Sequence, residues 1–253
     1  MHKEISFFND TSSSYLAEYA KTTTDGHSFR SRREKVLSLV PQSSGTALDV
    51  ACGPGILVEG LLKKGYAVTA VDAAPEMVER SRELFIGNPK VTLQVANVYE
   101  LPFADESFDV ITALGLLEYL DREDVALTEM IRVTKPGGLL ILTYPHKWSP
   151  WRIIIRLTLS LYRLVRPPIK LTHASGHPLV HREYSERMVK EMLTKKGLAV
   201  EHIRYYNFKL VPYPFDQWLP RFTVWQSKLL EYSLPYWLRG IGTGFIVTAR
   251  KQR

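Results

Sequence analysis

Cysteine is almost absent from the sequence, since Cys52 is the only one among 253 residues. A single thiol cannot form a disulfide within the chain, and it cannot hold a metal ion or an iron–sulfur cluster that needs several cysteines. We therefore expect a cytoplasmic protein from a reducing compartment.

Long apolar runs are also absent. No segment approaches the length of about 18 apolar residues typical of a membrane-spanning helix, and Met1–Asp10 has no signal-peptide core. The formal net charge is +7, which favours acidic small molecules, anionic lipids or nucleic acids as partners. Because the chain has no long basic run and no nucleic-acid-binding module, we do not expect nucleic acid as the partner.

The middle of the chain alternates short apolar runs with helical patterns. The predicted strands are Thr46–Ala51, Ala67–Asp72, Val91–Ala96, Phe108–Leu114 and Gly138–Tyr144, and the predicted helices are Ile56–Lys64, Pro75–Phe85 and Arg122–Val133. The strands are nearly continuous in apolar residues, as in a parallel sheet covered on both faces. This order predicts a doubly wound α/β fold.

The last third of the chain has a different pattern. Ser185–Lys196 is predicted as a helix, and Leu198–Tyr206 and Gly242–Arg250 as two closing strands. Two aromatic-rich segments, Trp148–Pro168 and Phe208–Arg239, fit neither the sheet nor its crossover helices.

A glycine-rich turn follows the first predicted strand, in the segment LDVACGPG from Leu48 to Gly55. Glycine lets the backbone approach a ligand closely. Asp72 ends the next strand, where a carboxylate can accept hydrogen bonds from both hydroxyls of a ribose. The turn lacks the third glycine of a dinucleotide fingerprint, since that position is Val58. Asp49 would also repel a pyrophosphate, so the pattern favours a cationic ligand without phosphates.

These residues resemble the class I (Rossmann-like) S-adenosylmethionine-dependent methyltransferases, in particular the type 11-like enzymes that act on small molecules. Six segments match in the family's order: LDVACGPG, VDAAPEMVERSRE, ANVYELPFADESFDVI, LEYL, EMIRVTKPGGLLILTYP and HREYSERMVKEMLTKKGL. The resemblance implies a mostly parallel seven-stranded sheet with an antiparallel last strand, plus a helical, aromatic-rich acceptor cap. It also implies S-adenosyl-L-methionine as the cofactor.

The resemblance assigns roles to individual positions. The methionine end of the cofactor would contact Asp49, Ala51, Gly53 and Gly55, with Tyr15 or Tyr19 near its carboxylate. The adenosine end would contact Asp72, Ala73, Met77, Asn97 and Val98, and the transferable methyl would lie near Leu114 and Gly115. Two positions depart from the family pattern, because Ala51 replaces the usual glycine and Asn97 replaces a frequent aspartate. Either Tyr15 and Tyr19 touch the cofactor or their helix packs its aromatic rings onto the core.

Methyl transfer needs positioning of the acceptor more than a fixed set of catalytic residues. Where the acceptor has a proton to lose, a histidine is the natural base. His181 is the first candidate because it opens the family-like segment HREYS, and His177 and His146 follow. The alternative is that these are loop or cap histidines. We expect no metal ion.

We expect one domain, 1–253, with an N-terminal lid (1–40), a cofactor-binding core (41–147) and two acceptor-cap insertions (148–183 and 208–239). As a helix, Trp148–Pro168 would carry four arginines within about 80° of one another, opposite a wide apolar face. Such a helix either packs on the sheet or lies on an anionic membrane surface as a peripheral contact.

The predicted function is S-adenosylmethionine-dependent methylation of a hydrophobic small molecule such as a lipid, quinone, polyketide or terpenoid. Oxygen is the expected target atom. One alternative is C-methylation or cyclisation in natural-product assembly on the same fold. Another is a non-catalytic, cofactor-binding protein associated with a membrane.

Overall fold

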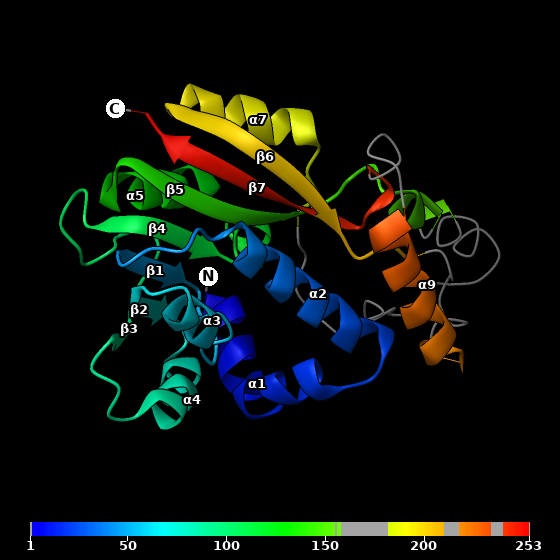
Figure 1. Ribbon diagram of the computed structural model, residues 1–253, viewed down its shortest axis with the longest axis horizontal. Coiled ribbons are helices and arrows are strands. Elements are labelled where there is room, and N and C mark those ends of the chain that lie inside the picture. The colour runs from blue at the N-terminus through cyan, green and yellow to red at the C-terminus, as the bar shows by residue number, and fades with distance from the viewer. Residues whose placement is uncertain (1, 155, 158–181, 210–217, 234–239, 253) are drawn as a thin grey trace.

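The computed structural model describes residues 2–154, 156–157, 182–209, 218–233 and 240–252, with the side chains of the first few left aside. Figure 1 shows the arrangement of the elements. The helices are α1 (His2–Ala20), α2 (Thr24–Leu39), α3 (Val58–Lys63), α4 (Pro75–Phe85), the short 3₁₀ helix η1 (Leu117–Tyr119), α5 (Glu123–Val133), α7 (Glu186–Lys195) and α9 (Pro220–Ser233). The strands are β1 (Thr46–Val50), β2 (Ala67–Asp72), β3 (Val91–Val95), β4 (Phe108–Ala113), β5 (Thr134–Pro145), β6 (Leu198–Tyr206) and β7 (Gly244–Lys251).

A seven-stranded sheet forms the centre of the protein, in the order β3-β2-β1-β4-β5-β7-β6. The first five strands of that order are parallel, and β7 runs antiparallel to both β5 and β6. The predicted fold class is therefore confirmed, including the antiparallel last strand.

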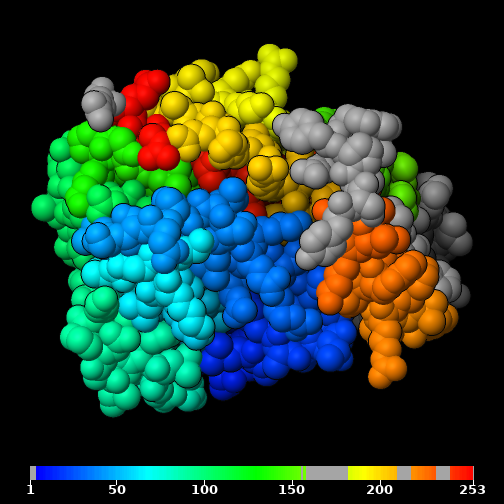
Figure 2. Space-filling view, viewed as in Figure 1, coloured from blue at the N-terminus to red at the C-terminus, as the bar shows by residue number. Residues whose placement is uncertain are grey.

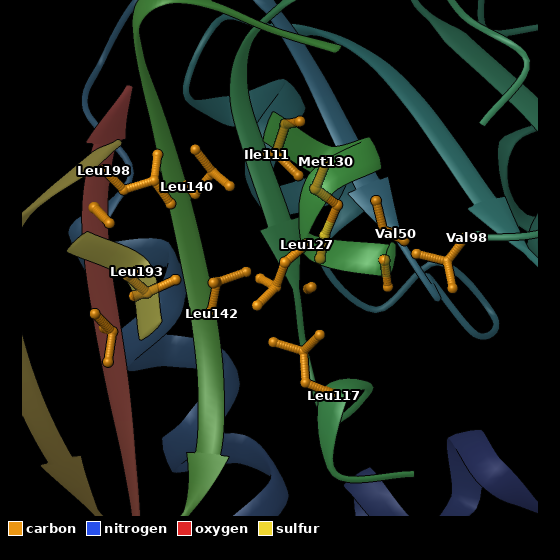
Figure 3. Packing of buried hydrophobic residues seen from close by; sticks show 14 of the residues in the cluster. Val50, Val98, Ile111, Leu117, Leu127, Met130, Leu140, Leu142, Leu193 and Leu198 are labelled. Carbon is orange, nitrogen blue, oxygen red and sulfur yellow. The ribbon is translucent and has the colours of Figure 1, made fainter. Parts of the chain in front are cut away.

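Helices cover both faces of this sheet, as a doubly wound fold requires. On one face, α5 and α7 pack Leu127, Met130 and Leu193 against β4, β5 and β7, and Figure 3 shows this packing around Leu140 and Leu142. On the other face, α2 and α3 place Val36, Val58 and Leu61 in a cluster with residues of β1, β2, β4, β5 and β7. Burial of apolar side chains on both faces explains the unbroken apolar runs of the sequence.

The order of the strands reverses between β1 and β4. After β1 the chain adds β2 and β3 on one side, and it then returns to add β4 and β5 on the other. The crossover connections separate at that point and leave a crevice beyond the carboxyl ends of β1 and β4. The glycine-rich turn after β1 lies at this crevice.

Several boundaries differ from the sequence prediction. β5 begins at Thr134 and not at Gly138, because residues predicted as a turn continue the strand through a register shift opposite Phe108 and Val110. Gly137 has a φ of +75°, which glycine adopts without strain. α9 lies inside a segment whose aromatic and proline content concealed its helical pattern.

The first predicted insertion is only partly described. Residues 150–154 and 156–157 are helical, and the rest of Trp148–Pro168, including Arg163 and Arg166, lies outside the described residues. Arg152 and Arg156 both bind the carboxylate of Glu183, at 2.9 and 3.1 Å. Two of the four arginines of this predicted helix are therefore held by ion pairs within the protein. Within the described part of the chain, no helix is both long and apolar enough to cross a bilayer.

Candidate functional site

The turn after β1 is built from residues with left-handed backbone conformations. Ala51, Gly53 and Gly55 have φ values of 57°, 53° and 80°. Among these three residues only Ala51 has a strained backbone, since a residue with a Cβ rarely adopts a positive φ. Gly55 is needed for packing, because a Cβ there would collide with Ser81 and Phe85. Gly53 faces open space, with only Tyr15 within reach of an added Cβ, at 3.8 Å.

The carboxylate of Asp72 fixes this turn to the end of β2. Its Oδ2 accepts a hydrogen bond from the backbone N–H of Gly53 at 2.8 Å, and its Oδ1 accepts one from the N–H of Ala74 at 2.9 Å. Burial raises the pKa of Asp72, and the backbone hydrogen bonds from Ala74, Gly53 and Ala73 oppose that rise. Each carboxylate oxygen has a second lone pair, so Asp72 can still accept hydrogen bonds from a ligand.

Asp49 has a buried carboxylate, one oxygen of which accepts no hydrogen bond. The residue is 1% exposed. Its Oδ1 accepts a hydrogen bond from the hydroxyl of Thr112 at 2.7 Å, whereas its Oδ2 has no partner. Burial raises the pKa of Asp49 to about 7, and the hydrogen bond from Thr112 offsets part of this effect. An orphaned buried carboxylate oxygen is costly unless a ligand supplies a cation or a donor.

A pocket of about 830 Å³, counting the space open to solvent, extends from this turn along the ends of β1, β2 and β4. Helix α1 lies along its outer side and contributes Glu4, Ile5, Phe8 and Tyr15 to its wall. We call this pocket the cofactor cavity. The residues from the sheet side are Val50, Ala51, Gly53, Val71, Asp72, Ala73, Ala74, Met77, Ala96, Val98, Leu114, Gly115, Leu116, Tyr119 and Leu120.

A smaller hollow continues the cofactor cavity beneath the glycine-rich turn. Tyr15, Ala51, Gly53 and Leu114 line both spaces, and Asp49 and Tyr19 belong to the smaller one. The leftover oxygen of Asp49 therefore belongs to the end of the site away from Met77 and Val98.

A second, larger cavity adjoins the first. Phe8, Tyr15, Gly115 and Tyr119 line both of them. The second cavity extends between α1, α2 and the carboxyl end of β5, and its wall also includes Phe29, Arg32, Glu118, Arg152 and Tyr206. We call it the acceptor cavity. It is rich in aromatic rings but also holds several charged side chains.

Most residues predicted to bind the cofactor line these pockets. They are Tyr15, Tyr19, Asp49, Ala51, Gly53, Asp72, Ala73, Met77, Val98, Leu114 and Gly115. Gly55 and Asn97 are not among the lining residues. Gly55 packs against α4, and the Asn97 side chain accepts a hydrogen bond from the N–H of Tyr99 at 3.0 Å, where it stabilises its own turn.

The predicted histidines have different positions. His177 and His181 lie outside the described residues. His146 is buried, with its Nδ1 at 3.1 Å from the carbonyl oxygen of Gly242 and its ring against Tyr205 and Phe245. Burial lowers the pKa of His146. It is not among the residues that line the acceptor cavity, so its role as a base stays a prediction. No cluster of metal-ligating side chains occurs within the described ranges.

Two charged residues of the acceptor cavity were missed by the sequence reasoning. Arg32 comes from α2, far from any motif, and Glu118 lies in the segment LEYL, where only the family resemblance drew attention to it. Burial raises the pKa of Glu118. Neither residue type stands out in a chain with 33 basic and 26 acidic residues, and only the fold brings the two to one cavity.

Comparison with protein families gives one match, to a family model described as a methyltransferase domain, over residues 48–142. A methyltransferase from Mycobacterium tuberculosis is 35% identical over 111 residues, which is 44% of this chain and 43% of that protein. A protein of Geotalea daltonii named ubiquinone/menaquinone biosynthesis C-methyltransferase is 35% identical over 118 residues, or 44% of this chain and 50% of that one. The chain thus spans about half the length of these curated relatives.

Solved structures share the fold over a longer stretch. A chain from the complex between the Haloferax volcanii Trm112 methyltransferase activator and a methyltransferase is similar with a TM-score of 0.68 and 17% identity, covering 97% of this chain and 98% of that chain. An S-adenosylmethionine-dependent methyltransferase from Mesorhizobium loti gives a TM-score of 0.58 at 17% identity, over 86% and 96% of the two chains. At these identities the likeness shows the fold alone.

The buried carboxyl of Asp49 predicts a pH dependence of stability in the ligand-free protein. Between its ordinary pKa near 4 and its raised pKa of about 7, the folded state holds a proton that the unfolded state has lost. The free energy of unfolding therefore falls as the pH rises through this window. Asp49→Asn should lack this fall, so the difference between the two proteins should change by on the order of 4 kcal/mol between about pH 4 and pH 7.

Urea unfolding of both proteins at a series of pH values measures this difference. Asp10→Asn, at an exposed carboxylate of α1, serves as the control and should follow the wild type. If the wild-type and Asp49→Asn curves stay parallel across the window, Asp49 does not titrate as a buried group.

Proposed function

We propose that the chain is a class I methyltransferase, because residues 48–142 match a methyltransferase-domain model, and that it transfers a methyl group from S-adenosyl-L-methionine to a hydrophobic small molecule. The observation that carries the proposal is the cofactor cavity together with the smaller hollow beneath its turn, because each of the two spaces has an aspartate in its wall. Asp72 lies at the end of β2, and Asp49 leaves an unpartnered buried oxygen below the turn.

The residues of the cavity fit this cofactor. Asp72 can accept hydrogen bonds from the ribose hydroxyls with its free lone pairs, and Met77, Val98 and Ala73 supply apolar surface for the adenine. The ammonium of the methionine moiety suits the Asp49 end of the site, because it offers the donor that Oδ2 lacks. The positive-φ turn provides the close backbone approach, since Gly53 has no Cβ to obstruct it.

A nicotinamide dinucleotide would not suit the same site. Its pyrophosphate needs a glycine-rich turn free of nearby negative charge. Here Asp49 and Asp72 both adjoin the turn. Burial raises the pKa of the Cys52 thiol within it, and the charges of Asp49 and Asp72 add to that rise. The electrostatic field of the site thus favours a cation over a phosphate.

The bound cofactor supplies an electrophilic methyl group on a sulfonium. The protein contributes the position of the acceptor, which can account for much of the acceleration. Gly115 and Tyr119 line both the cofactor cavity and the acceptor cavity, so they border the place of transfer. Leu114 precedes Gly115 in the chain and lines the cofactor cavity. Helix α1 covers the junction with Phe8 and Tyr15 and restricts the access of water.

The acceptor is proposed to be a hydrophobic molecule whose reactive oxygen receives the methyl group. Phe8, Phe29, Tyr119 and Tyr206 supply aromatic surface for its apolar part. C-methylation is the alternative, and the name of the Geotalea daltonii relative favours it. Cyclisation on the same fold and non-catalytic binding of the cofactor are the remaining alternatives.

Transfer of a labelled methyl group tests the activity directly. The protein is incubated with methyl-labelled cofactor and an organic extract of cells, and the products are identified by mass spectrometry. We expect label in an apolar product, attached to oxygen. Label on carbon would favour the alternative, and an extract without label would refute catalysis on that class of acceptor.

The cofactor site itself gives a sharper prediction. Asp72→Ala should weaken the binding of S-adenosylhomocysteine at least about tenfold, or roughly 1.4 kcal/mol, because it removes the ribose acceptor and the anchor of the turn. Isothermal titration calorimetry measures the change. Asp124→Ala, at an exposed position of α5, is the control and should bind normally. Equal affinity of wild type and Asp72→Ala would contradict the assignment.

We further propose that the protein is cytoplasmic, binds an anionic membrane surface peripherally and takes its acceptor from there. Trp218, Phe222, Trp225 and Leu229 are spaced like one face of a helix, along α9 and just before it, and they are 70, 50, 58 and 49% exposed. Figure 2 shows α9 at one end of the molecule, away from α4. Exposed aromatic residues with nearby basic ones are typical of interfacial helices.

Sedimentation with lipid vesicles tests this contact. The protein should bind phosphatidylcholine vesicles that contain phosphatidylglycerol more strongly than vesicles of phosphatidylcholine alone, and the double variant Phe222→Ser, Trp225→Ser should lose most of the binding. Leu84→Ser, Ile86→Ser is the matched control, because these side chains are also exposed but lie on and after α4. Equal loss in both double variants, or no binding by the wild type, would exclude the contact.

A further inference from the structure

The acceptor cavity contains two opposite charges that form no ion pair. Among the described residues of its lining, Lys21 pairs with Glu18, Lys209 with Asp25 at 3.0 Å, and Arg152 with Glu183 at 2.9 Å. Within the part of the chain that the structure describes, Arg32 and Glu118 have no such partner. An unpaired charge inside a protein is costly, so an ionisable residue of this kind in a cavity is a candidate for a functional role.

Arg32 lies among aromatic rings, and within the described residues no carboxylate forms an ion pair with it. Its guanidinium is 5.3 Å from the centre of the Phe29 ring, and its Nη1 would be 3.0 Å from a Cβ added at Gly115. The hydroxyls of Tyr19 and Tyr206 are its hydrogen-bonding neighbours, and its Nε has no acceptor. Gly115 also borders the cofactor cavity, so this cation lies beside the place of methyl transfer.

Glu118 is the matching anion. It belongs to η1, directly after the segment that carries Leu114 and Gly115, and it is 6% exposed. Its Oε2 is buried and accepts no hydrogen bond. Glu118 and Arg32 act on each other electrostatically but do not form an ion pair, so an acceptor group can interact with both.

Several ionisable groups from neighbouring elements act on Glu118. Arg32 from α2 and Arg152 from the helix after β5 stabilise its charge, whereas Glu123 at the start of α5 opposes it. The hydroxyls of Tyr119, Tyr144, Tyr184 and Tyr206 also interact with it. Burial outweighs these effects and raises the pKa of Glu118, which makes its carboxylate a stronger proton acceptor than an exposed glutamate.

Building on the function proposed above, we propose that the acceptor is an acidic hydroxyl compound, namely a phenol, quinol or enol, and that Glu118 takes its proton while Arg32 stabilises the resulting oxyanion. The assignment rests on the two unpaired charges in one aromatic-lined cavity next to Gly115. A simple alcohol would not ionise here, because its hydroxyl is far less acidic than that of a phenol, quinol or enol.

The step balances in charge and in atoms. The O–H bond of the acceptor breaks and its proton moves to Glu118 Oε2, so the negative charge passes from the carboxylate to the acceptor oxygen beside Arg32. The electron pair of that oxygen, or of the ring carbon conjugated with it, then forms the bond to the methyl carbon. The bond from that carbon to sulfur breaks, and its electron pair stays on the sulfur. The cavity keeps one positive and one negative charge until the transfer.

A chromogenic phenol, 4-nitrophenol, is the probe for this assignment, because its phenolate is yellow and its neutral form is not. The probe is added to the whole protein loaded with S-adenosylhomocysteine, at a pH below the probe's own pKa. We expect the yellow phenolate to appear on binding, without net release of a proton to the buffer, since Glu118 retains it. Calorimetry in two buffers of different ionisation enthalpy measures proton release.

Variants separate the two roles. Glu118→Gln should still bind the phenolate but release about one proton per bound probe, because the internal acceptor is gone. Arg32→Gln should bind the probe at least about tenfold more weakly and leave it colourless, and Arg32→Lys should restore part of the colour. Glu59→Gln and Arg80→Gln, on the exposed faces of α3 and α4, are matched controls and should behave as the wild type.

Two results would overturn the assignment. One is a bound probe that stays neutral in the wild type, and the other is a wild type that releases as many protons as Glu118→Gln. Both rely on the wild type, so they remain decisive if a variant does not fold. Binding of S-adenosylhomocysteine without ionisation of the probe would refute this inference alone, whereas failure to bind S-adenosylhomocysteine would refute the proposed function.

Discussion

The two hydrogen bonds that Asp72 accepts from the backbone at Gly53 and Ala74 are the constraint on which the site depends. They hold a turn with a run of positive φ values against the end of β2. Without them, the alanine at position 51 would have little reason to keep a left-handed backbone. A buried carboxylate that satisfies orphan N–H groups also stays within reach of a ligand, so the same side chain organises the crevice and lines it.

The sequence predicted the parts of the fold that depend on local pattern. The sequence predicted all seven strands. The central strands leave an unbroken apolar signal because both of their faces are buried, whereas the edge strands β3 and β6 are partly exposed. The cap at Ser185 marked the start of α7. The predicted strand boundary was wrong where tertiary contacts determine it. Pairing with β4 extends β5 back to Thr134, through a proline and a glycine with positive φ. Helix α9 was not predicted, because the segment is rich in aromatic residues and prolines. The helical spacing of Trp218, Phe222 and Trp225 becomes apparent only in the structure.

The same contrast holds for the site. Asp49, Gly53 and Asp72 follow strand ends, so a sequence can place them at one edge of a sheet. Gly55 and Asn97 match the family's motif too. In the structure, however, Gly55 packs against α4 and Asn97 stabilises its own turn. Arg32 and Glu118 carry no motif of their own, since they meet only after α2 has crossed the sheet and η1 has formed beyond β4. Long-range pairing of this kind leaves no periodic trace in a single sequence.

The N-terminal helices connect the two halves of the site. Phe8 and Tyr15 of α1 line both cavities, and Arg32 of α2 reaches the junction at Gly115. Helices that cover a reaction centre exclude water, which strengthens every electrostatic interaction within it. The exclusion has a physical consequence for Glu118 and Arg32. In water their charges would be screened and of little use, whereas beneath α1 and α2 each must find a partner, and an acceptor that ionises is a molecule able to satisfy both.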